Sequence, residues 1–170
     1  MRGLIVYESL WGNTEKVARA IAAALSATLQ VDVADVDSAP DSVVGYDLLV
    51  VGGPTHAFSM TRASTRQNAV SQNGAPSAPD RGIREWLNVL TPTEVAVKAV
   101  AFDTRVNAPR LPGSAAKVAR QELHSLGFDT SLRQKSFHVH GYEGPLVEGE
   151  LERAAQWGRE VSDAHASHTA

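Results

Sequence analysis

The chain has 170 residues, no cysteine and a formal net charge of -3 at pH 7. This length suits one domain that buries about 70% of its unfolded surface, and the lack of cysteine excludes thiol catalysis, thiolate metal sites and a disulfide scaffold. The sequence shows neither an apolar run near the roughly 20 residues of a membrane span nor a basic run interleaved with aromatics, so we expect a cytoplasmic protein that binds no nucleic acid.

The N-terminal stretch combines a strand, a loop and a helix. Residues 4–7 form an apolar, strand-like run, and residues 8–14 interrupt both the strand period and the helix period. Apolar side chains then recur at helical spacing at Val17, Ile21 and Leu25. A small, polar loop between a strand and a helix N-terminus is typical of a phosphate site, because backbone N–H groups and the helix dipole favour an anion there.

This loop predicts recognition of a phosphate by backbone and hydroxyl groups rather than by cations. It carries no Lys or Arg before Lys16, and its polar side chains include Ser9, Asn13 and Thr14. Gly12 lets the backbone turn toward the anion without a Cβ in the way. At about 1.5 to 3 kcal/mol per hydrogen bond to a charged acceptor, four or five such bonds would hold a monophosphate. The motifs GxxxxGK[ST] and GxGxxG are absent, which excludes two other phosphate-binding loops.

The rest of the chain alternates strands and helices. Residues 31–36 alternate as in a half-exposed edge strand, and residues 48–51 form a continuous apolar run that Gly52, Gly53 and Pro54 should end sharply. The further predicted elements are a short helix within 60–71, a flexible loop at 73–79, a helix at 83–90, a strand at 95–102, a helix capped by Ser114 and ended by Gly127, a strand at 137–140 and a helix at about 148–161.

This order of elements predicts an α/β protein. Five strands with four or five intervening helices indicate a mostly parallel sheet with helices on both faces, which is a three-layer sandwich. We expect a single domain over residues 1–162 and a frayed tail at 163–170. In such sheets ligands bind at the carboxyl ends of the strands, so the loops after the first, third and fourth strands should meet.

Two motifs in these loops resemble the flavodoxin family, and the resemblance covers nearly the whole chain. Residues 9–14 read Ser-Leu-Trp-Gly-Asn-Thr, similar to the family's [ST]-x-[ST]-G-x-T phosphate loop, and residues 53–55 read Gly-Pro-Thr, similar to its G-x-P-T flavin loop. The resemblance implies the sheet order 2-1-3-4-5, an FMN cofactor, and electron transfer between a reductase and an acceptor. It implies these cofactor-binding residues: Ser9, Leu10, Trp11, Gly12, Asn13 and Thr14; Pro54, Thr55, His56, Ala57 and Phe58; and Asp103, Thr104 and Arg105.

Three features depart from the family pattern. Trp11 replaces the usual middle hydroxyl, so one phosphate bond would be lost although the backbone N–H remains. Only His56 and Phe58 offer rings for the flavin, so we expect one flavin face to be less covered. In or just after the flavin loops there are also four arginines, namely Arg62, Arg66, Arg105 and Arg110. A basic rim would raise the flavin potential and receive an acidic partner or an NADPH phosphate, unless these arginines are simply solvated.

Two other features carry weaker signals. His138 and His140 alternate on one strand face. An HxH pair without a third ligand more often has a structural role than a metal-binding one, so no metal site is predicted. Trp86 and Trp157 lie on helical patterns and should pack inward. Three functions stay open: an electron carrier without acid-base residues of its own, a flavin-dependent NAD(P)H or quinone reductase, and a flavodoxin-fold binding or regulatory protein that has lost FMN.

Overall fold

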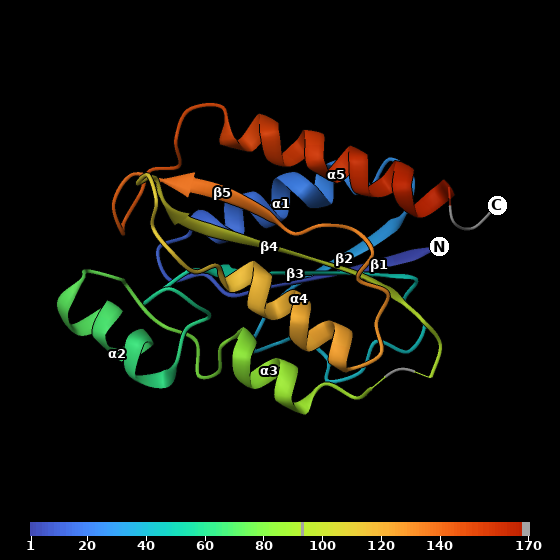
Figure 1. The fold of residues 1–170 in the computed structure, drawn as a ribbon, viewed down its shortest axis with the longest axis horizontal. Helices are drawn as coiled ribbons and strands as arrows, with labels where there is room; N and C mark the ends of the chain where they lie inside the picture. Colours follow the sequence, from blue (N-terminus) through green and yellow to red (C-terminus); the bar gives the residue numbers. More distant parts are fainter. Residues whose placement is uncertain (93, 168–170) are drawn as a thin grey trace.

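The structure is a computed structural model that describes residues 1–92 and 94–167 (Figure 1). Within these residues, five parallel strands form one sheet in the order β2-β1-β3-β4-β5, which confirms the predicted fold class. The elements are β1 Arg2–Tyr7, α1 Asn13–Leu25, β2 Gln30–Asp35, β3 Leu48–Pro54, α2 Ala63–Gln72, α3 Ile83–Val89, β4 Lys98–Val106, α4 Ala115–Ser125, β5 Lys135–Val139 and α5 Glu150–Ser167.

Helices cover both faces of the sheet (Figure 1). The α1 and α5 helices lie over one face and the α3 and α4 helices over the other, while α2 lies at the end of the molecule. Side chains of β3 alternate between the two cores, with Leu48 and Val50 facing α1 and α5 and Leu49 and Val51 facing α3 and α4. Burial on both sides explains why this strand reads as a continuous apolar run.

The predicted helices are close to those observed. The apolar stripe of α1 is fully buried, and Ser114 caps α4 by accepting a hydrogen bond from the Lys117 N–H group at 3.2 Å. The predicted packing of Trp86 and Trp157 is also confirmed, since both side chains are buried.

The predicted sharp end of β3 before Gly52 is wrong. The strand continues to Pro54, because Gly52 pairs with Phe102 and Pro54 pairs with Thr104 in the neighbouring strand. A Cβ added at Gly52 would lie 2.0 Å from Cζ of Phe102. This glycine therefore makes room for an aromatic ring in the middle of the sheet rather than ending a strand.

The strand predicted at 95–102 is displaced toward the C-terminus. The observed β4 runs from Lys98 to Val106, so Asp103, Thr104 and Arg105 belong to a strand and do not open a loop. They are held there on both sides, by β3 up to Pro54 and by β5 up to Val139. Pairing with two neighbouring strands overrides the polar composition that suggested a loop.

The frayed tail predicted from residue 163 is wrong for residues 163–167. The α5 helix continues to Ser167, because Ser162 and His165 are buried on its inner side. The Oγ atom of Ser162 lies 2.6 Å from Oγ1 of Thr28, just after α1, which ties the two helices together. The remaining predicted tail residues, 168–170, lie outside the described part of the chain.

Candidate functional site

A small cavity, with about 30 Å³ of space for water-sized molecules, lies at the carboxyl ends of the central strands. The loops after β1 and β3 meet the end of β4 there, as predicted, and the Thr55 N–H group donates to the Thr104 carbonyl oxygen at 2.8 Å. Nine predicted site residues line the cavity: Leu10, Trp11, Asn13, Thr14, Pro54, Thr55, His56, Thr104 and Arg105. Five do not line it: Ser9, Gly12, Ala57, Phe58 and Asp103.

The loop after β1 presents backbone donors at the start of α1. Gly12 adopts a φ of 91°, and the Ser9 hydroxyl closes the turn by accepting from the N–H groups of Gly12 at 3.1 Å and Glu15 at 3.3 Å. Within residues 1–92 and 94–167, the N–H groups of Trp11, Asn13 and Thr14 donate no hydrogen bond. Three N–H groups at the N-terminus of a 13-residue helix fit a phosphate.

Three aromatic rings form one wall of the cavity. The ring centroids of Trp11, His56 and Tyr142 lie 6.0 to 6.3 Å from one another. Trp11 is held by a hydrogen bond from Nε1 to the Asn73 carbonyl oxygen, at 3.2 Å. Burial lowers the pKa of His56, so its imidazole is neutral at pH 7. The wall is therefore largely apolar and suits a flat, aromatic ligand.

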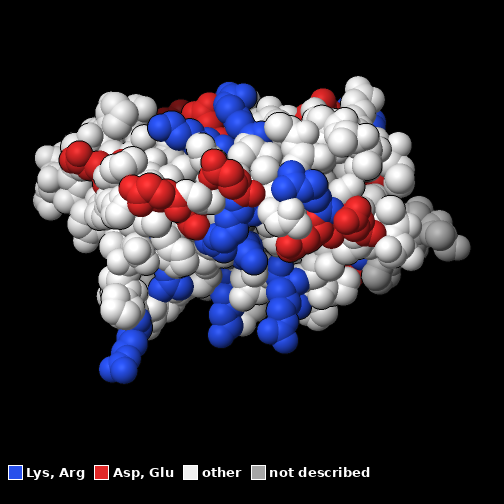
Figure 2. Space-filling view, turned by 90° about the horizontal axis from the view of Figure 1, so that it is seen from above, with Lys and Arg blue, Asp and Glu red and all other residues white. Residues whose placement is uncertain are grey.

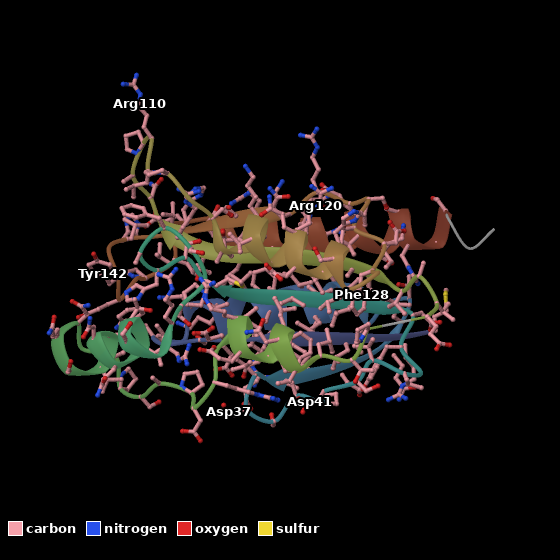
Figure 3. The ribbon with its side chains drawn as sticks, turned by 60° about the horizontal axis from the view of Figure 1, so that its bottom comes forward. Asp37, Asp41, Arg110, Arg120, Phe128 and Tyr142 are labelled. Carbon is pink, nitrogen blue, oxygen red and sulfur yellow. The ribbon has the colours of Figure 1, made fainter. Side chains whose placement is uncertain are left out.

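Tyr142 was missed by the sequence prediction. It lies in the loop after β5 (Figure 3), and its ring stacks on that of Trp11 at the cavity. The side-chain amide of Asn13 donates to the Glu143 carbonyl oxygen at 2.9 Å. Phe58, expected to cover the flavin, is instead 59% exposed and lies outside the cavity lining.

Asp103 is hydrogen-bonded to the loop after β3 and to the start of α4, on the side of the sheet that faces α4. Its side chain is fully buried, and Oδ2 accepts from the hydroxyls of Thr55 and Ser114 at 2.9 and 2.6 Å and from the Ala116 N–H at 3.1 Å. Strand alternation sends Asp103 toward α4 and its neighbour Thr104 toward the cavity. Asp103 therefore positions the start of α4 and the loop after β3.

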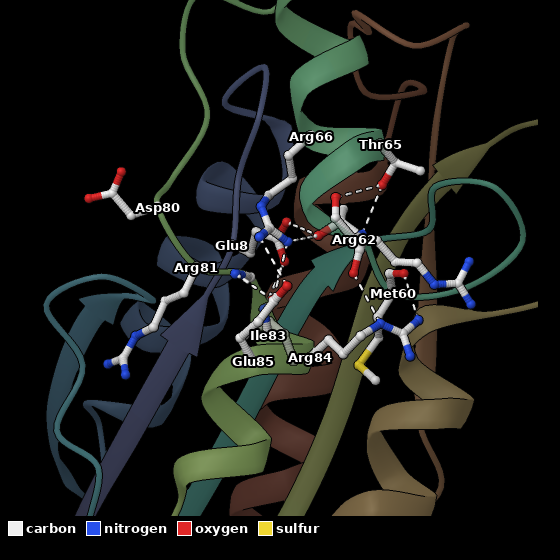
Figure 4. Close-up of polar contacts among 12 residues, drawn as sticks. Glu8, Met60, Arg62, Thr65, Arg66, Asp80, Arg81, Ile83, Arg84 and Glu85 are labelled. Carbon is white, nitrogen blue, oxygen red and sulfur yellow. Dashed lines mark hydrogen bonds and ion pairs between the residues drawn. The ribbon is translucent and has the colours of Figure 1, made fainter.

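A second buried network lies behind the phosphate loop (Figure 4). Glu8 is 1% exposed; it accepts a hydrogen bond from the Thr61 hydroxyl, and its Oε2 accepts from the Ile83 N–H at 2.8 Å. Burial raises the pKa of Glu8 above its ordinary range. This network joins the end of β1 to the start of α3, and the polar spacing of the sequence did not reveal it.

Arg66 belongs to this network and not to the basic rim. Its side chain is buried, and its guanidinium donates to Thr61 at 3.0 Å and to both carboxylate oxygens of Glu85 at 3.0 and 3.2 Å. The predicted rim of four arginines is therefore wrong at this position. A buried guanidinium in such a network stabilises the fold around the site rather than meeting a partner.

The three other arginines differ in their relation to the cavity. Arg105 lines the cavity and donates from Nη2 to the Leu111 carbonyl oxygen at 2.6 Å. Arg62 is exposed, and Arg110 is exposed and points away from the body of the molecule (Figure 3). Among the described lining residues, Arg105 alone is a Lys, Arg, Asp or Glu. The cavity therefore carries a positive charge.

The described residues around His138, in β5, and His140, just after it, do not form a metal cluster. In the described residues there is no group of three or more His, Cys, Asp or Glu that could hold a metal ion. The Nδ1 atom of His138 lies 3.6 Å from Glu150 Oε2, and Nε2 of His140 lies 3.7 Å from Glu148 Oε2. Over the same residues, every helix is too short or too polar to cross a membrane.

Comparison with solved structures shows that the chain has the flavodoxin fold. Flavodoxin 2 from Bacillus cereus is 19% identical, with 99% of each chain covered and a TM-score of 0.67. The flavodoxin of Streptococcus pneumonia TIGR4 is 18% identical, with 96% of this chain and 99% of that chain covered and a TM-score of 0.68. The rubredoxin oxygen:oxidoreductase of Desulfovibrio gigas is 19% identical over 99% of this chain and 37% of that chain, with a TM-score of 0.66.

The family model described as Flavodoxin matches residues 5–71, which include both motifs of the predicted site. This match and the shared fold confirm the resemblance to flavodoxins that was read from the two motifs. None of the curated proteins matches the chain.

Proposed function

We propose that this protein binds one FMN and carries electrons between a reductase and an acceptor protein. The observation that carries the proposal is the set of three backbone N–H groups at the start of α1, beside a cavity with an aromatic wall. These donors match a phosphate that is recognised without cations, and the rings match a flat heterocycle. The family match agrees with this cofactor.

The chain's own residues would divide the binding of FMN among them. The N–H groups of Trp11, Asn13 and Thr14 would hold the phosphate, and the Ser9 hydroxyl would keep the loop in shape. The rings of Trp11 and Tyr142 would exclude water from the flavin. Bound FMN supplies reversible uptake of one or two electrons, which no side chain of this cavity can provide.

Arg105 would adjust the redox behaviour of the bound flavin. Its charge lies at the cavity wall, where no described lining residue is acidic. A cation beside the flavin stabilises the negative charge of the reduced form, so the reduction potential would rise. Neutral His56 contributes no opposing charge.

The same arginine favours a second candidate function, a flavin-dependent NAD(P)H or quinone reductase. A cation at the cavity wall suits a phosphate of NADPH as well as a reduced flavin. The two candidates differ in whether the flavin takes hydride directly from a nicotinamide.

One assay separates these candidates. FMN-loaded protein is mixed with NADPH or NADH and a quinone, without an added reductase, and nicotinamide absorbance is followed. An electron carrier leaves the nicotinamide unoxidised until a reductase is added. Rapid oxidation without a reductase would overturn the carrier and establish the second candidate. A protein that cannot be loaded with FMN would refute both and favour a binding or regulatory role.

A further inference from the structure

The imidazole of His56 places an unpartnered polar atom inside the cavity. His56 lines the cavity, and its Nδ1 atom is buried. Among the residues that the structure describes, this atom has no hydrogen-bond partner. A buried ring nitrogen in this state is unfavourable, because it has lost contact with water without gaining a hydrogen bond. The Nδ1 atom is therefore a candidate contact for a ligand of the cavity.

The backbone around His56 holds this ring in place. The N–H group of His56 donates to the Ser59 carbonyl oxygen at 2.9 Å. The two residues between them, Ala57 and Phe58, have φ values of 49° and 68°. Residues other than glycine are strained in this left-handed region, and such strain persists only where the surrounding structure enforces it. The loop after β3 therefore presents the imidazole from a well-defined turn.

The groups that face His56 leave its imidazole neutral. The loop after β1 contributes the uncharged ring of Trp11 and the loop after β5 that of Tyr142, with ring centroids 6.1 and 6.0 Å away. Arg105, at the end of β4, is the one charged residue of the described lining, and Glu143 lies outside this lining. Burial lowers the pKa of His56, and no acid of the described lining opposes that effect. Near pH 7, the ring therefore takes up a proton only if a negative charge enters the cavity.

The outer surface does not supply this negative charge. On the face seen in Figure 2, Lys and Arg side chains are interspersed with Asp and Glu side chains. Exposed charges of mixed sign largely cancel, and salt screens them over about 8 Å at physiological ionic strength. The negative charge of a reduced flavin in the cavity would be screened less, because the aromatic wall excludes water. A reduced flavin is therefore the charge that would change the protonation of His56.

We propose that His56 takes up one proton when FMN in the cavity is reduced and releases it when the FMN is oxidised again. This inference rests on the proposed function, since it requires a flavin in this cavity. The reductase loses two electrons, which pass to the bound FMN together with one proton from water. A second proton from water forms an N–H bond on the His56 imidazole, whose positive charge then balances the negative charge of the reduced flavin. Reoxidation by the acceptor returns both protons to water.

NMR of the imidazole tests the proposal on the whole chain. Protein labelled with ¹⁵N on histidine and loaded with FMN is compared at pH 6.5 in the oxidised form and after anaerobic reduction with dithionite. The His56 signals are those that the His56→Gln variant lacks. We expect the His56 ring nitrogens to change from the neutral to the charged pattern on reduction and to change back on reoxidation. His124, which is exposed on α4 and lies outside the cavity lining, should not change. A His56 ring that stays neutral would overturn the proposal.

The midpoint potential of bound FMN should report the same proton. One proton taken up with two electrons changes this potential by about 30 mV per pH unit, since that is a tenfold change in the equilibrium constant of a two-electron couple. Between the pKa of His56 in the oxidised protein and its higher pKa in the reduced protein, the wild-type potential should fall by this much more per pH unit than that of His56→Gln. The variant has no imidazole to ionise, and His124→Gln should match the wild type.

The possible outcomes are distinct. Equal slopes in the wild type and His56→Gln from pH 5 to pH 8 would refute proton uptake by His56. If His56→Gln does not retain FMN, the change in the wild-type NMR signals decides the question. Flavin absorbance after gel filtration reports FMN binding in each sample. Wild-type protein without FMN would overturn both the proposed function and this inference, whereas bound FMN with an unchanged His56 ring would overturn this inference alone.

Discussion

The side-chain oxygens of Thr14 and Thr104 lie 2.7 Å apart in the wall of the cavity, although the two residues are 90 positions apart in the sequence. Both residues are buried, one in the first turn of α1 and the other in β4. This hydrogen bond joins the start of α1 to the strand that bears Arg105. Because the Thr14 hydroxyl is already oriented by Thr104, it would lose less conformational entropy when it binds a ligand.

Thr14→Val should weaken FMN binding about tenfold or more. The substitution keeps the shape of the side chain but removes a hydroxyl, and a hydrogen bond to a charged acceptor contributes about 1.5 to 3 kcal/mol. The change is measured by fluorescence titration of FMN. Thr28→Val is the control, because Thr28 makes a similar hydroxyl contact, to Ser162 at 2.6 Å, at the other end of α1. Equal affinity in the Thr14→Val variant and the wild type would count against this site.

Asp103→Ala should lower the free energy of unfolding by about 3 kcal/mol, even without FMN. The substitution leaves two hydroxyls and one N–H group without their acceptor in a fully buried place. Asp103→Asn should lose less stability than Asp103→Ala, because the amide oxygen of asparagine can still accept a hydrogen bond from some of these three donors. Urea denaturation of both variants measures the difference. A loss of FMN affinity with unchanged stability would instead make Asp103 a direct flavin ligand.

The stability of the protein should depend on pH through Glu8. Burial raises the pKa of Glu8, so the folded state holds this proton more tightly than the unfolded state does. The resulting stabilisation is complete below about pH 4.3, the ordinary value of a glutamate, and is lost as the pH rises through the raised pKa.

Glu8→Gln tests this dependence, because glutamine cannot ionise. The free energy of unfolding of the variant minus that of the wild type should increase from pH 4 to pH 8. The other carboxyl groups are common to both proteins, so their contributions cancel in the difference. Urea denaturation across this pH range measures it, and a difference that stays constant or decreases with pH would contradict a raised pKa.

The sequence predicts the fold well because its periodic signals are local. The apolar stripe of α1 and the continuous run in β3 specify which faces are buried, and the Ser114 cap marks the start of α4. The ends of strands are less predictable, because Gly52 and Asp103 resemble loop residues until pairing with neighbouring strands is considered. The burial of the last turns of α5 depends on tertiary contacts with α1 in the same way.

The sequence predicts the parts of the candidate site that depend on one local segment. It does not predict the contacts between segments that are far apart in the chain. The turn of residues 9–14 at the start of α1 follows from the local sequence alone, since the spacing of polar residues and the placement of Gly12 define it. Tyr142 reaches the cavity from the loop after β5, more than 120 residues from Trp11, and no local pattern indicates this contact. Arg66 could not be distinguished from a surface arginine, because its partner Glu85 comes from a separate helix.

Arg105→Ala should lower the midpoint potential of bound FMN by about 20 to 40 mV. This range corresponds to about 1 to 2 kcal/mol for a two-electron couple, as expected for a partly solvated charge. Spectroelectrochemical titration measures the potential. Arg110→Ala is the matched control, because Arg110 is exposed and points away from the body of the molecule. Unchanged potential in Arg105→Ala, or an equal change in both variants, would remove the proposed role of Arg105.

Titration of FMN with the cofactor-free protein tests the central claim most directly. If the N–H groups of Trp11, Asn13 and Thr14 hold the phosphate beside the aromatic wall, FMN fluorescence should be quenched and should reach a plateau at one equivalent of protein. Riboflavin, which has the same ring system but no phosphate, should bind at least tenfold more weakly. Unquenched FMN fluorescence and a colourless protein after dialysis would show that this cavity does not bind FMN.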